Sequence, residues 1–594
     1  MMKKVALSLL LTTSLAHGQS TDEKMQWFAD AKLGIFIHWG IYSVNGIAES
    51  WSFFNEYTPY DNYRRQLSGF TASQYQPEAW AQMIRQSGAK YAVITSKHHD
   101  GVALWDSKAP GSLSVPLHAA AKKDVLTPFV NALKHEGLKT GIYFSLPDWS
   151  HTDYDIFTRT TKRYDYKAEQ ARFEKFVRYY QSQLKELSNL YHPDLYWFDG
   201  DWEHTAEEWK AADTRQMLLQ RNPKAIINAR LANKGDYETP EQGIPVKAPK
   251  ADYWELCYTM NDSWGYQQDD KNYKPANQII KTLVECISMG GNLLLDIGPK
   301  ADGTIPAEQE QILQELGRWT NKHQEAVYGT TRGISQDYFS GKSALSKDRK
   351  SLFLYLSNTQ NGQVWLRGIE SRVKSVTLVG SGQKLTFSQN REDVWIDFPE
   401  SAADPDVTVL RVDFNEVLKT GPVGIPSLEG TSTQQIKQLA YAAGMGHNPF
   451  QKGDVRINGE SKISVKDAKV QAWISKHAEI FENPLQKGLS DGRYAGMSTL
   501  SADGRTLYLF VDGNTNGSLM VKGLMNSIQR VRIVGDGAIL SHKIYDKLFW
   551  SEVPGLVTIE VPKHRQDETM TVVALMLDTP LKEYDKEIRA VESN

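Results

Sequence analysis

Short apolar runs alternate with segments of helical periodicity between about residues 30 and 300. The runs are rich in β-branched and aromatic residues and are bounded by turn residues, as is typical of buried strands. We predict seven strands, at residues 33–39, 91–96, 140–145, 194–198, 225–229, 252–257 and 292–297. Helices are predicted between them, at residues 77–89, 125–136, 168–190, 207–220 and 278–289. This alternation predicts an α/β fold with a (β/α)8-type barrel, although only seven of its strands are evident.

The pattern changes after a last predicted helix at residues 306–328. From about residue 333 onward, strands alternate with turns rich in Gly, Asn and Asp. These strands are predicted at residues 351–356, 363–366, 373–379, 394–398 and 408–412. Such a series predicts a small antiparallel β-sandwich.

The chain then repeats this β unit. Turn glycines recur 155 residues later, in the pairs Gly341 and Gly496, Gly362 and Gly517, Gly368 and Gly523, and Gly380 and Gly535. The preceding helix recurs with an offset of 154, which pairs Trp319 with Trp473 and His323 with His477. One register kept over so many glycines indicates a duplicated domain. We therefore predict a barrel at 19–328, a β-sandwich at 329–415, and a linker, helical lead-in and second β-sandwich at 416–594.

The N-terminus has the pattern of a secretory signal peptide. Lys3 and Lys4 precede an apolar run at residues 5–11, and Ala16-His17-Gly18 suits cleavage before Gln19. We predict that residues 1–18 are removed and that the protein is exported, to the periplasm or out of the cell. The apolar run is too short to span a bilayer, and no later stretch is long enough, so no membrane partner is expected.

Composition narrows the function classes. The 594 residues hold 68 Lys and Arg against 71 Asp and Glu, a net charge of −3, which lacks the basic footprint of a nucleic-acid binder. The chain has only two cysteines, Cys257 and Cys286, and both lie in apolar or helical patterns that predict buried thiols. Its 16 Trp and 27 Tyr are either core residues or platforms for a flat apolar ligand face.

Polar and aromatic residues lie at or just past the C-terminal ends of the predicted strands, where barrel enzymes hold their active sites. They are His38, His98, His99, Tyr143, Trp197, Asp199, Arg230 and Glu241. The histidines and Asp199 are possible zinc ligands, whereas paired carboxylates among aromatic residues suit glycoside hydrolysis. The tryptophans around Asp199 favour a sugar as the ligand. Adjacent residues such as His98 and His99 point in different directions on a strand, which makes it awkward for both to bind one metal ion.

Four motifs in order carry a family resemblance: Gly-Ile-Phe-Ile-His-Trp-Gly at 34–40, Lys-His-His-Asp-Gly at 97–101, Trp-Phe-Asp-Gly at 197–200 and Gly-Gly-Asn-Leu-Leu-Leu-Asp-Ile-Gly-Pro at 290–299. Together they resemble glycoside hydrolase family 29, the α-L-fucosidases. The resemblance runs from about Trp27 to Tyr328. The first β unit fits the family's usual C-terminal β domain, and the second copy departs from its commoner layout.

The resemblance implies a retaining, double-displacement mechanism without metal or cofactor. Asp199 matches the nucleophile, and Glu241 matches the position of the acid/base, with Glu255 as the alternative. The remaining matches are substrate-binding residues: His38, His98 and His99 for the fucose hydroxyls, Trp51 and Trp264 for its apolar face, and Arg230, Tyr143, Trp197 and Glu49. At Glu49 the chain departs from the family, because Ser50 separates this residue from Trp51.

The expected partner is a fucosylated oligosaccharide or polysaccharide, and the oligomeric state stays open. Two functions other than α-L-fucoside hydrolysis are alternatives for this chain. One is a metal-dependent barrel hydrolase that uses His38, His98 and His99. The other is a non-catalytic glycan-binding protein, although none of its three candidate carboxylates is missing.

Overall fold

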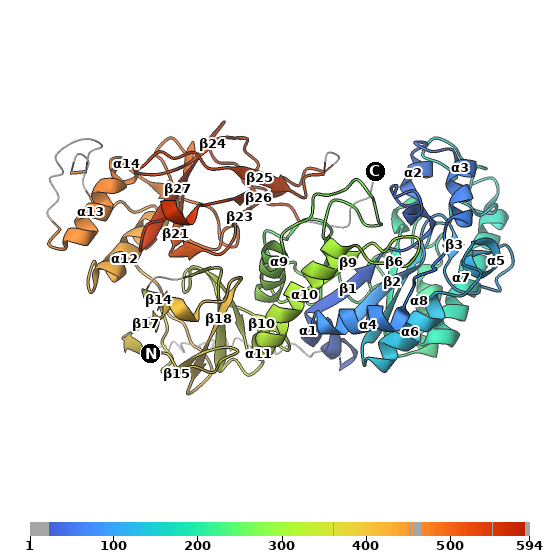
Figure 1. Ribbon diagram of the computed structural model, residues 1–594, viewed down its shortest axis with the longest axis horizontal. Coiled ribbons are helices and arrows are strands. Elements are labelled where there is room, and N and C mark those ends of the chain that lie inside the picture. The colour runs from blue at the N-terminus through green and yellow to red at the C-terminus, as the bar shows by residue number, and fades with distance from the viewer. Residues whose placement is uncertain (1–22, 360–361, 451–453, 456–464, 549–550, 588–594) are drawn as a thin grey trace, which may run out of the picture.

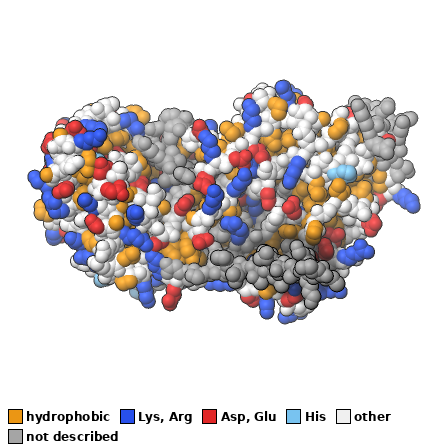
Figure 2. All heavy atoms as spheres, turned by 180° about the vertical axis from the view of Figure 1, so that it is seen from behind, with side chains coloured by type: hydrophobic (Ala, Val, Ile, Leu, Met, Phe, Trp, Pro, Cys, Tyr) orange, Lys and Arg blue, Asp and Glu red, His pale blue; other side chains and the backbone are white. Residues whose placement is uncertain are grey.

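The computed structural model describes residues 23–359, 362–450, 454–455, 465–548 and 551–587 (Figure 1). The predicted signal peptide lies outside the described residues. No helix in these ranges is long and apolar enough to cross a membrane. On the face seen in Figure 2, acidic and basic side chains are interspersed with apolar ones rather than gathered by sign.

A parallel seven-stranded sheet forms the N-terminal half of the chain. Its strands run in the order β7-β6-β5-β2-β1-β9-β8. They are β1 (Leu33–Ile37), β2 (Tyr91–Lys97), β5 (Lys139–Ser145), β6 (Leu195–Asp199), β7 (Ile226–Ile227), β8 (Glu255–Thr259) and β9 (Asn292–Ile297). All seven predicted strands are confirmed, although β7 is shorter than predicted. Each of the seven is buried along its whole length or but for one end residue, as expected for strands covered on both faces.

Helices lie between these strands along the chain or follow the last of them. They include α4 (Pro77–Gln86), α6 (Leu126–His135), α7 (Gln170–Tyr191), α8 (Ala211–Arg221), α9 (Ala276–Ser288), α10 (Ala307–Lys322) and α11 (Gln324–Val327). The single last helix predicted at 306–328 is wrong in one respect, because it breaks at His323. Nδ1 of His323 lies 2.9 Å from the carbonyl oxygen of Trp319.

The two edges of the parallel sheet are linked by an irregular segment. Isolated parallel bridges pair Asn228 beyond β7 with Tyr237, and Trp254 and Cys257 with Glu238 and Glu241. Residues 237–241 therefore lie between the edge strands, where an eighth strand would lie in a barrel. The segment contains Pro240, which cannot donate a ladder hydrogen bond, and this accounts for the missing strand pattern.

Two antiparallel β units follow, and their strand orders correspond one to one. The first has sheets β10-β11-β12-β18-β15 and β14-β17-β16, and the second has β19-β20-β21-β27-β24 and β23-β26-β25. The first unit comprises β10 (Thr331–Arg332), β11 (Lys342–Leu345), β12 (Ser351–Leu356), β14 (Gly362–Leu366), β15 (Val373–Leu378), β16 (Phe387–Asn390), β17 (Asp393–Phe398) and β18 (Thr408–Phe414). The second comprises β19 (Gln486–Lys487), β20 (Ser498–Leu500), β21 (Thr506–Asp512), β23 (Leu519–Lys522), β24 (Ile528–Ile533), β25 (His542–Tyr545), β26 (Leu556–Ile559) and β27 (Met570–Leu577). In each unit, apolar side chains from both sheets form one core.

Local geometry repeats between the units as well. Gly368 and Gly523 both have positive φ, 61° and 67°, a conformation that glycine adopts without strain. The indole nitrogens of Trp319 and Trp473 both donate to a backbone carbonyl at 2.8 Å. The short strands β13 (Asn358–Thr359) and β22 (Asn514–Thr515) then pair with each other antiparallel, so equivalent residues meet where the units join.

Both β units lie on the same side of the parallel sheet, with α9 and α10 facing them (Figure 1). A helix that the sequence patterns did not reveal, α12 (Ser432–Gly444), lies between the units. Thr431 and Gln434 form a capping box at its start, with reciprocal hydrogen bonds between side chain and backbone. Cys257 and Cys286 are buried free thiols, as predicted.

Candidate active site

A cavity opens at the C-terminal end of the parallel sheet. It is lined by Phe36, His38, Trp51, His98, Tyr143, Trp197, Asp199, Trp202, Arg230, Glu241 and Trp264. The structure therefore brings together nine of the twelve predicted site residues. Phe36 and Trp202 were not predicted, but both lie in motifs that the sequence singled out. Phe36 stands two residues before His38, so their side chains point to the same face of β1.

Arg230 links the two carboxylates of this cavity. Its Nη1 lies 2.9 Å from Oδ1 of Asp199, and its Nη2 lies 2.6 Å from Oε2 of Glu241. Burial alone would lower the pKa of Arg230, but Glu241 and Asp199 raise it well above its ordinary value. The guanidinium lies over the Trp197 ring, 4.5 Å from the centroid. Because adjacent nitrogens of one guanidinium hold both carboxylates, Asp199 and Glu241 are close neighbours.

Asp199, at the end of β6, has two further polar neighbours. The Tyr143 hydroxyl donates to Oδ2 of Asp199 at 3.0 Å, and Nε2 of His99 lies 3.6 Å from the same oxygen. The Tyr143 hydrogen bond and the Arg230 ion pair place a donor and a positive charge against the Asp199 carboxylate.

Each of the three histidines is anchored through Nδ1. The distance from Nδ1 is 2.7 Å to Oδ1 of Asp296 for His38, 2.6 Å to Oγ of Ser50 for His98, and 2.5 Å to Oγ of Ser145 for His99. Anchoring one ring nitrogen leaves Nε2 of each ring for another partner. Burial lowers the pKa of His38 and His98 well below the usual range, and that of His99 to about 3, so the rings are neutral.

Ser50 is the residue that separates Glu49 from Trp51. Its hydroxyl contacts His98 and also accepts from the backbone N–H of Asp100 at 2.8 Å. The departure from the family spacing therefore supplies an anchor for a site histidine. Glu49 does not line the cavity, and its carboxylate accepts from the backbone N–H of Gly265 instead.

Glu255 is fully buried beneath the cavity rather than lining it. Its carboxylate accepts from the Tyr91 hydroxyl and, at 3.0 Å, from the indole N–H of Trp197. Burial raises the pKa of Glu255 to about 7. The residue supports Trp197 from below, and of the two acid/base candidates only Glu241 lines the cavity.

Aromatic rings form the outer wall. The rings of Trp51 and Trp202 are stacked, with centroids 6.4 Å apart and an angle of 16° between their planes. The ring centroids of Trp264 and His38 lie 5.0 Å apart. Trp202 is 37% exposed, so it lies at the mouth of the cavity. Such a wall suits the apolar face of a sugar.

The histidines do not form a metal centre with this geometry. Within the described ranges, no group of three or more His, Cys, Asp or Glu side chains is arranged to hold a metal ion. The metal-dependent alternative therefore finds no support in the placement of His38, His98 and His99.

A model of the family described as alpha-L-fucosidase matches residues 12–325, more than half of the chain. The chain belongs to the α-L-fucosidases of glycoside hydrolase family 29. Mouse tissue alpha-L-fucosidase is 30% identical over 440 residues, which cover 68% of this chain and 93% of the mouse protein. The family assignment makes the chain a glycoside hydrolase.

Solved structures of family members agree with the fold. Alpha-L-fucosidase isoenzyme 1 from Paenibacillus thiaminolyticus superposes with a TM-score of 0.61 and 29% identity, covering 66% of this chain and 99% of that one. A Bacteroides thetaiotaomicron alpha-L-fucosidase was trapped as a covalent intermediate with 2-fluoro-fucosyl fluoride. Its structure superposes with a TM-score of 0.59 and 28% identity, covering 66% of this chain and 96% of that one. These matches leave about a third of the chain uncovered, a share that fits one of its two β units.

Proposed function

We propose that this family 29 protein is a retaining α-L-fucosidase in which Asp199 is the nucleophile and Glu241 the acid/base. The observation that carries the proposal is the clamp of both carboxylates by Arg230 inside one aromatic cavity. Retaining glycosidases need their two carboxylates about 5–5.5 Å apart, a separation that two carboxylates bound to adjacent nitrogens of one guanidinium can adopt. The covalent intermediate trapped on the Bacteroides relative supports the same type of mechanism.

In the first step, Asp199 attacks the anomeric carbon of a terminal α-L-fucosyl group. Glu241 donates a proton to the glycosidic oxygen as its bond to that carbon breaks. In the second step, Glu241 takes a proton from water, the water oxygen attacks the same carbon, and Asp199 leaves. Two inversions retain the α configuration. The neutral histidines and Tyr143 bind sugar hydroxyls, and the tryptophans contact the apolar face and methyl group.

The substrate is a fucosylated oligosaccharide or polysaccharide, and the leading residues 1–18 direct export to the periplasm or out of the cell. The domain boundaries follow the sequence proposal, with a (β/α)8-like barrel at 19–328 and β-sandwich domains at 329–415 and within 416–594. N-terminal sequencing of the protein recovered outside the cytoplasm tests the export. A mature N-terminus at Gln19 is expected.

Asp199→Ala tests the mechanism, with 4-nitrophenyl α-L-fucoside as the substrate. We expect the variant to lose at least 1,000-fold in turnover, in line with removal of a covalent nucleophile (roughly 10³ or more). Azide should restore activity by entering from the vacated side and forming β-L-fucosyl azide, which NMR identifies. A variant that keeps activity, or a wild-type product of inverted configuration, contradicts the proposal.

A further inference from the structure

The second β unit lies directly against the segment that follows Glu241. Gly523, at the end of β23, faces Val246, and a Cβ added to this glycine would lie 2.9 Å from Cγ2 of Val246. Gly492 is equally close, since its added Cβ would lie 3.0 Å from the Val246 carbonyl oxygen. Backbone at two glycines, both with positive φ, thus forms the surface on which residues 243–247 rest.

Lys522 fastens this contact. Its ammonium group donates to the carbonyl oxygen of Pro245 at 2.9 Å. Pro245 lies 277 residues before Lys522 in the sequence and four residues after Glu241. The side chain is only 3% exposed, so water competes little for this hydrogen bond.

The other end of the same contact is a buried carboxylate of α9. Oε2 of Glu285 lies 2.7 Å from Nζ of Lys522 and 2.9 Å from Nζ of Lys342 in the first β unit. Burial alone would raise the pKa of Glu285, but the two ammonium groups lower it below its ordinary value. Glu285 is therefore ionised and ties Lys522 to the helix that precedes β9.

A second buried anchor joins the same unit to β8. Asp546 accepts from the Tyr258 hydroxyl at 2.6 Å and lies 3.1 Å from Nζ of Lys274. Tyr258 follows Cys257, whose backbone N–H donates to the Pro240 carbonyl at 3.1 Å. The segment that carries Glu241 is thus held by β8 on one side, and β8 itself is held by the second unit.

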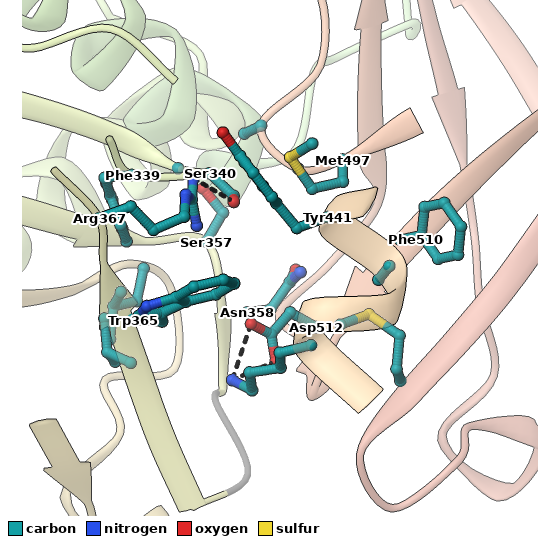
Figure 3. Close-up of a pocket in the computed structure, with 18 of the residues that line it drawn as sticks. Phe339, Ser340, Ser357, Asn358, Trp365, Arg367, Tyr441, Met497, Phe510 and Asp512 are labelled. Atoms are coloured by element: carbon teal, nitrogen blue, oxygen red, sulfur yellow. Dashed lines mark hydrogen bonds and ion pairs between the residues drawn. The ribbon is translucent and has the colours of Figure 1, made fainter. Parts of the chain in front are cut away.

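The first β unit uses the equivalent face differently. Arg367 stands 155 residues before Lys522, at the same place in the repeat. It lies between the rings of Trp365 and Tyr441, 4.9 and 4.2 Å from their centroids, and faces α12 instead of the parallel sheet (Figure 3). One face of a duplicated domain therefore packs on a helix in one copy and on the acid/base segment in the other.

We propose that Lys522 is a positioning residue for Glu241. By holding the Pro245 carbonyl, the second β unit keeps the Glu241 carboxyl where it can deliver a proton to the leaving-group oxygen. Small displacements of a catalytic group cost large factors in rate, so an anchor four residues away acts on the chemistry without touching the substrate. The inference rests on the proposed function.

Two substrates separate positioning of the acid from a general structural effect. Nitrophenolate leaves from 4-nitrophenyl α-L-fucoside with little help from an acid, whereas a fucosylated disaccharide needs a proton on its sugar oxygen. We expect Lys522→Met in the full chain to lower kcat/KM about ten-fold for the disaccharide and less than two-fold for the nitrophenyl fucoside. The matched control is Lys281→Met, because Lys281 of α9 is also a buried lysine whose ammonium group donates to backbone carbonyls of the second β unit, those of Asn516 and Ser518, rather than to the segment that follows Glu241. It should leave the ratio of the two kcat/KM values unchanged.

Equal losses on both substrates, or the same change of ratio in Lys281→Met, would overturn the inference. If Lys522→Met does not fold, as judged by its thermal unfolding, Val246→Ala tests the same contact, because this substitution removes only two methyl groups from it. We expect it to lower disaccharide hydrolysis selectively, by about three-fold, and an unchanged ratio counts against the proposal. A wild-type chain that cleaves neither fucoside refutes the proposed function instead.

Discussion

The hydroxyl oxygen of Ser145 lies 2.5 Å from Nδ1 of His99 and 2.6 Å from the carbonyl oxygen of Pro147. A carbonyl cannot donate, so the single Ser145 proton is directed to Pro147, and Nδ1 of His99 must carry the proton that Ser145 accepts. Nε2 of the neutral ring is then an acceptor. It is buried and makes no hydrogen bond within the described part of the chain. A ligand hydroxyl that donates to this nitrogen would satisfy it.

Ser145→Ala should disturb this arrangement. Without its acceptor, Nδ1–H of His99 is no longer held, and the ring is free to carry its proton on Nε2, toward Asp199. We expect kcat/KM for 4-nitrophenyl α-L-fucoside to fall about ten-fold, the equivalent of roughly 1.4 kcal/mol for one hydrogen bond. The control is Ser87→Ala, whose buried hydroxyl donates to the Ile84 carbonyl in helix α4, away from the cavity. Equal kinetics in the two variants would show that the Ser145 contact does not orient the site.

Matched amide variants distinguish Glu241 from Glu255 as the acid/base. Glu241→Gln should lower kcat/KM for a fucosylated disaccharide by about 100-fold or more. Among the described residues that line the cavity, the one other carboxyl is that of Asp199, the proposed nucleophile, so none is left to protonate the leaving oxygen. Glu255→Gln should cost less than about ten-fold, because the amide can still pair with Tyr91 and Trp197. Steady-state kinetics on the disaccharide distinguishes the two, and the reverse order would move the acid/base assignment to Glu255.

Stability should depend on pH through Glu255. Its folded pKa, raised by burial to about 7, exceeds its ordinary value of 4.5, so the folded protein binds a proton that the unfolded chain releases. The stabilising contribution is complete below pH 4.5 and is lost as the pH rises through 7. The amide of Glu255→Gln does not ionise. Between pH 5 and pH 8, the free energy of unfolding of this variant relative to that of wild type should therefore rise by at most about 3 kcal/mol. Urea unfolding at both pH values measures this, and a difference that does not change with pH contradicts it.

Trp202 at the mouth of the cavity should bind substrate. Its half-exposed indole extends the aromatic wall beside Trp51. Trp202→Ala should raise KM for a fucosylated oligosaccharide about five-fold with little change in kcat, since a stacking contact contributes on the order of 1 kcal/mol. Trp202→Phe keeps a ring and should lie close to wild type. Similar KM values for the alanine variant and wild type would exclude Trp202 from the binding surface.

Most of the parallel sheet could be predicted because its strands are short apolar runs between clear turns. The segment at 237–241 could not, since it pairs through isolated bridges around Pro240 and has no period of two. The sequence patterns do not predict helix α12 either, which lies in the range 416–594 where a linker is expected before the second β unit. The family motifs pointed to Asp199, the proposed nucleophile, and to the histidines around it. They did not reveal that Ser50, Ser145 and Asp296 anchor these histidines, because those roles depend on contacts between separate strands and loops.

By itself, the sequence determined the alternation of strands and helices, the duplicated β unit and the set of residues at the strand ends. These follow from local periodicity and from repeated turn glycines, which neighbouring residues encode. Only the tertiary structure decided that Arg230 holds both carboxylates, that Glu255 is buried below the site, and that Lys522 reaches Pro245. Each depends on packing between segments far apart in the chain, and burial then sets the charge and strength of the contact.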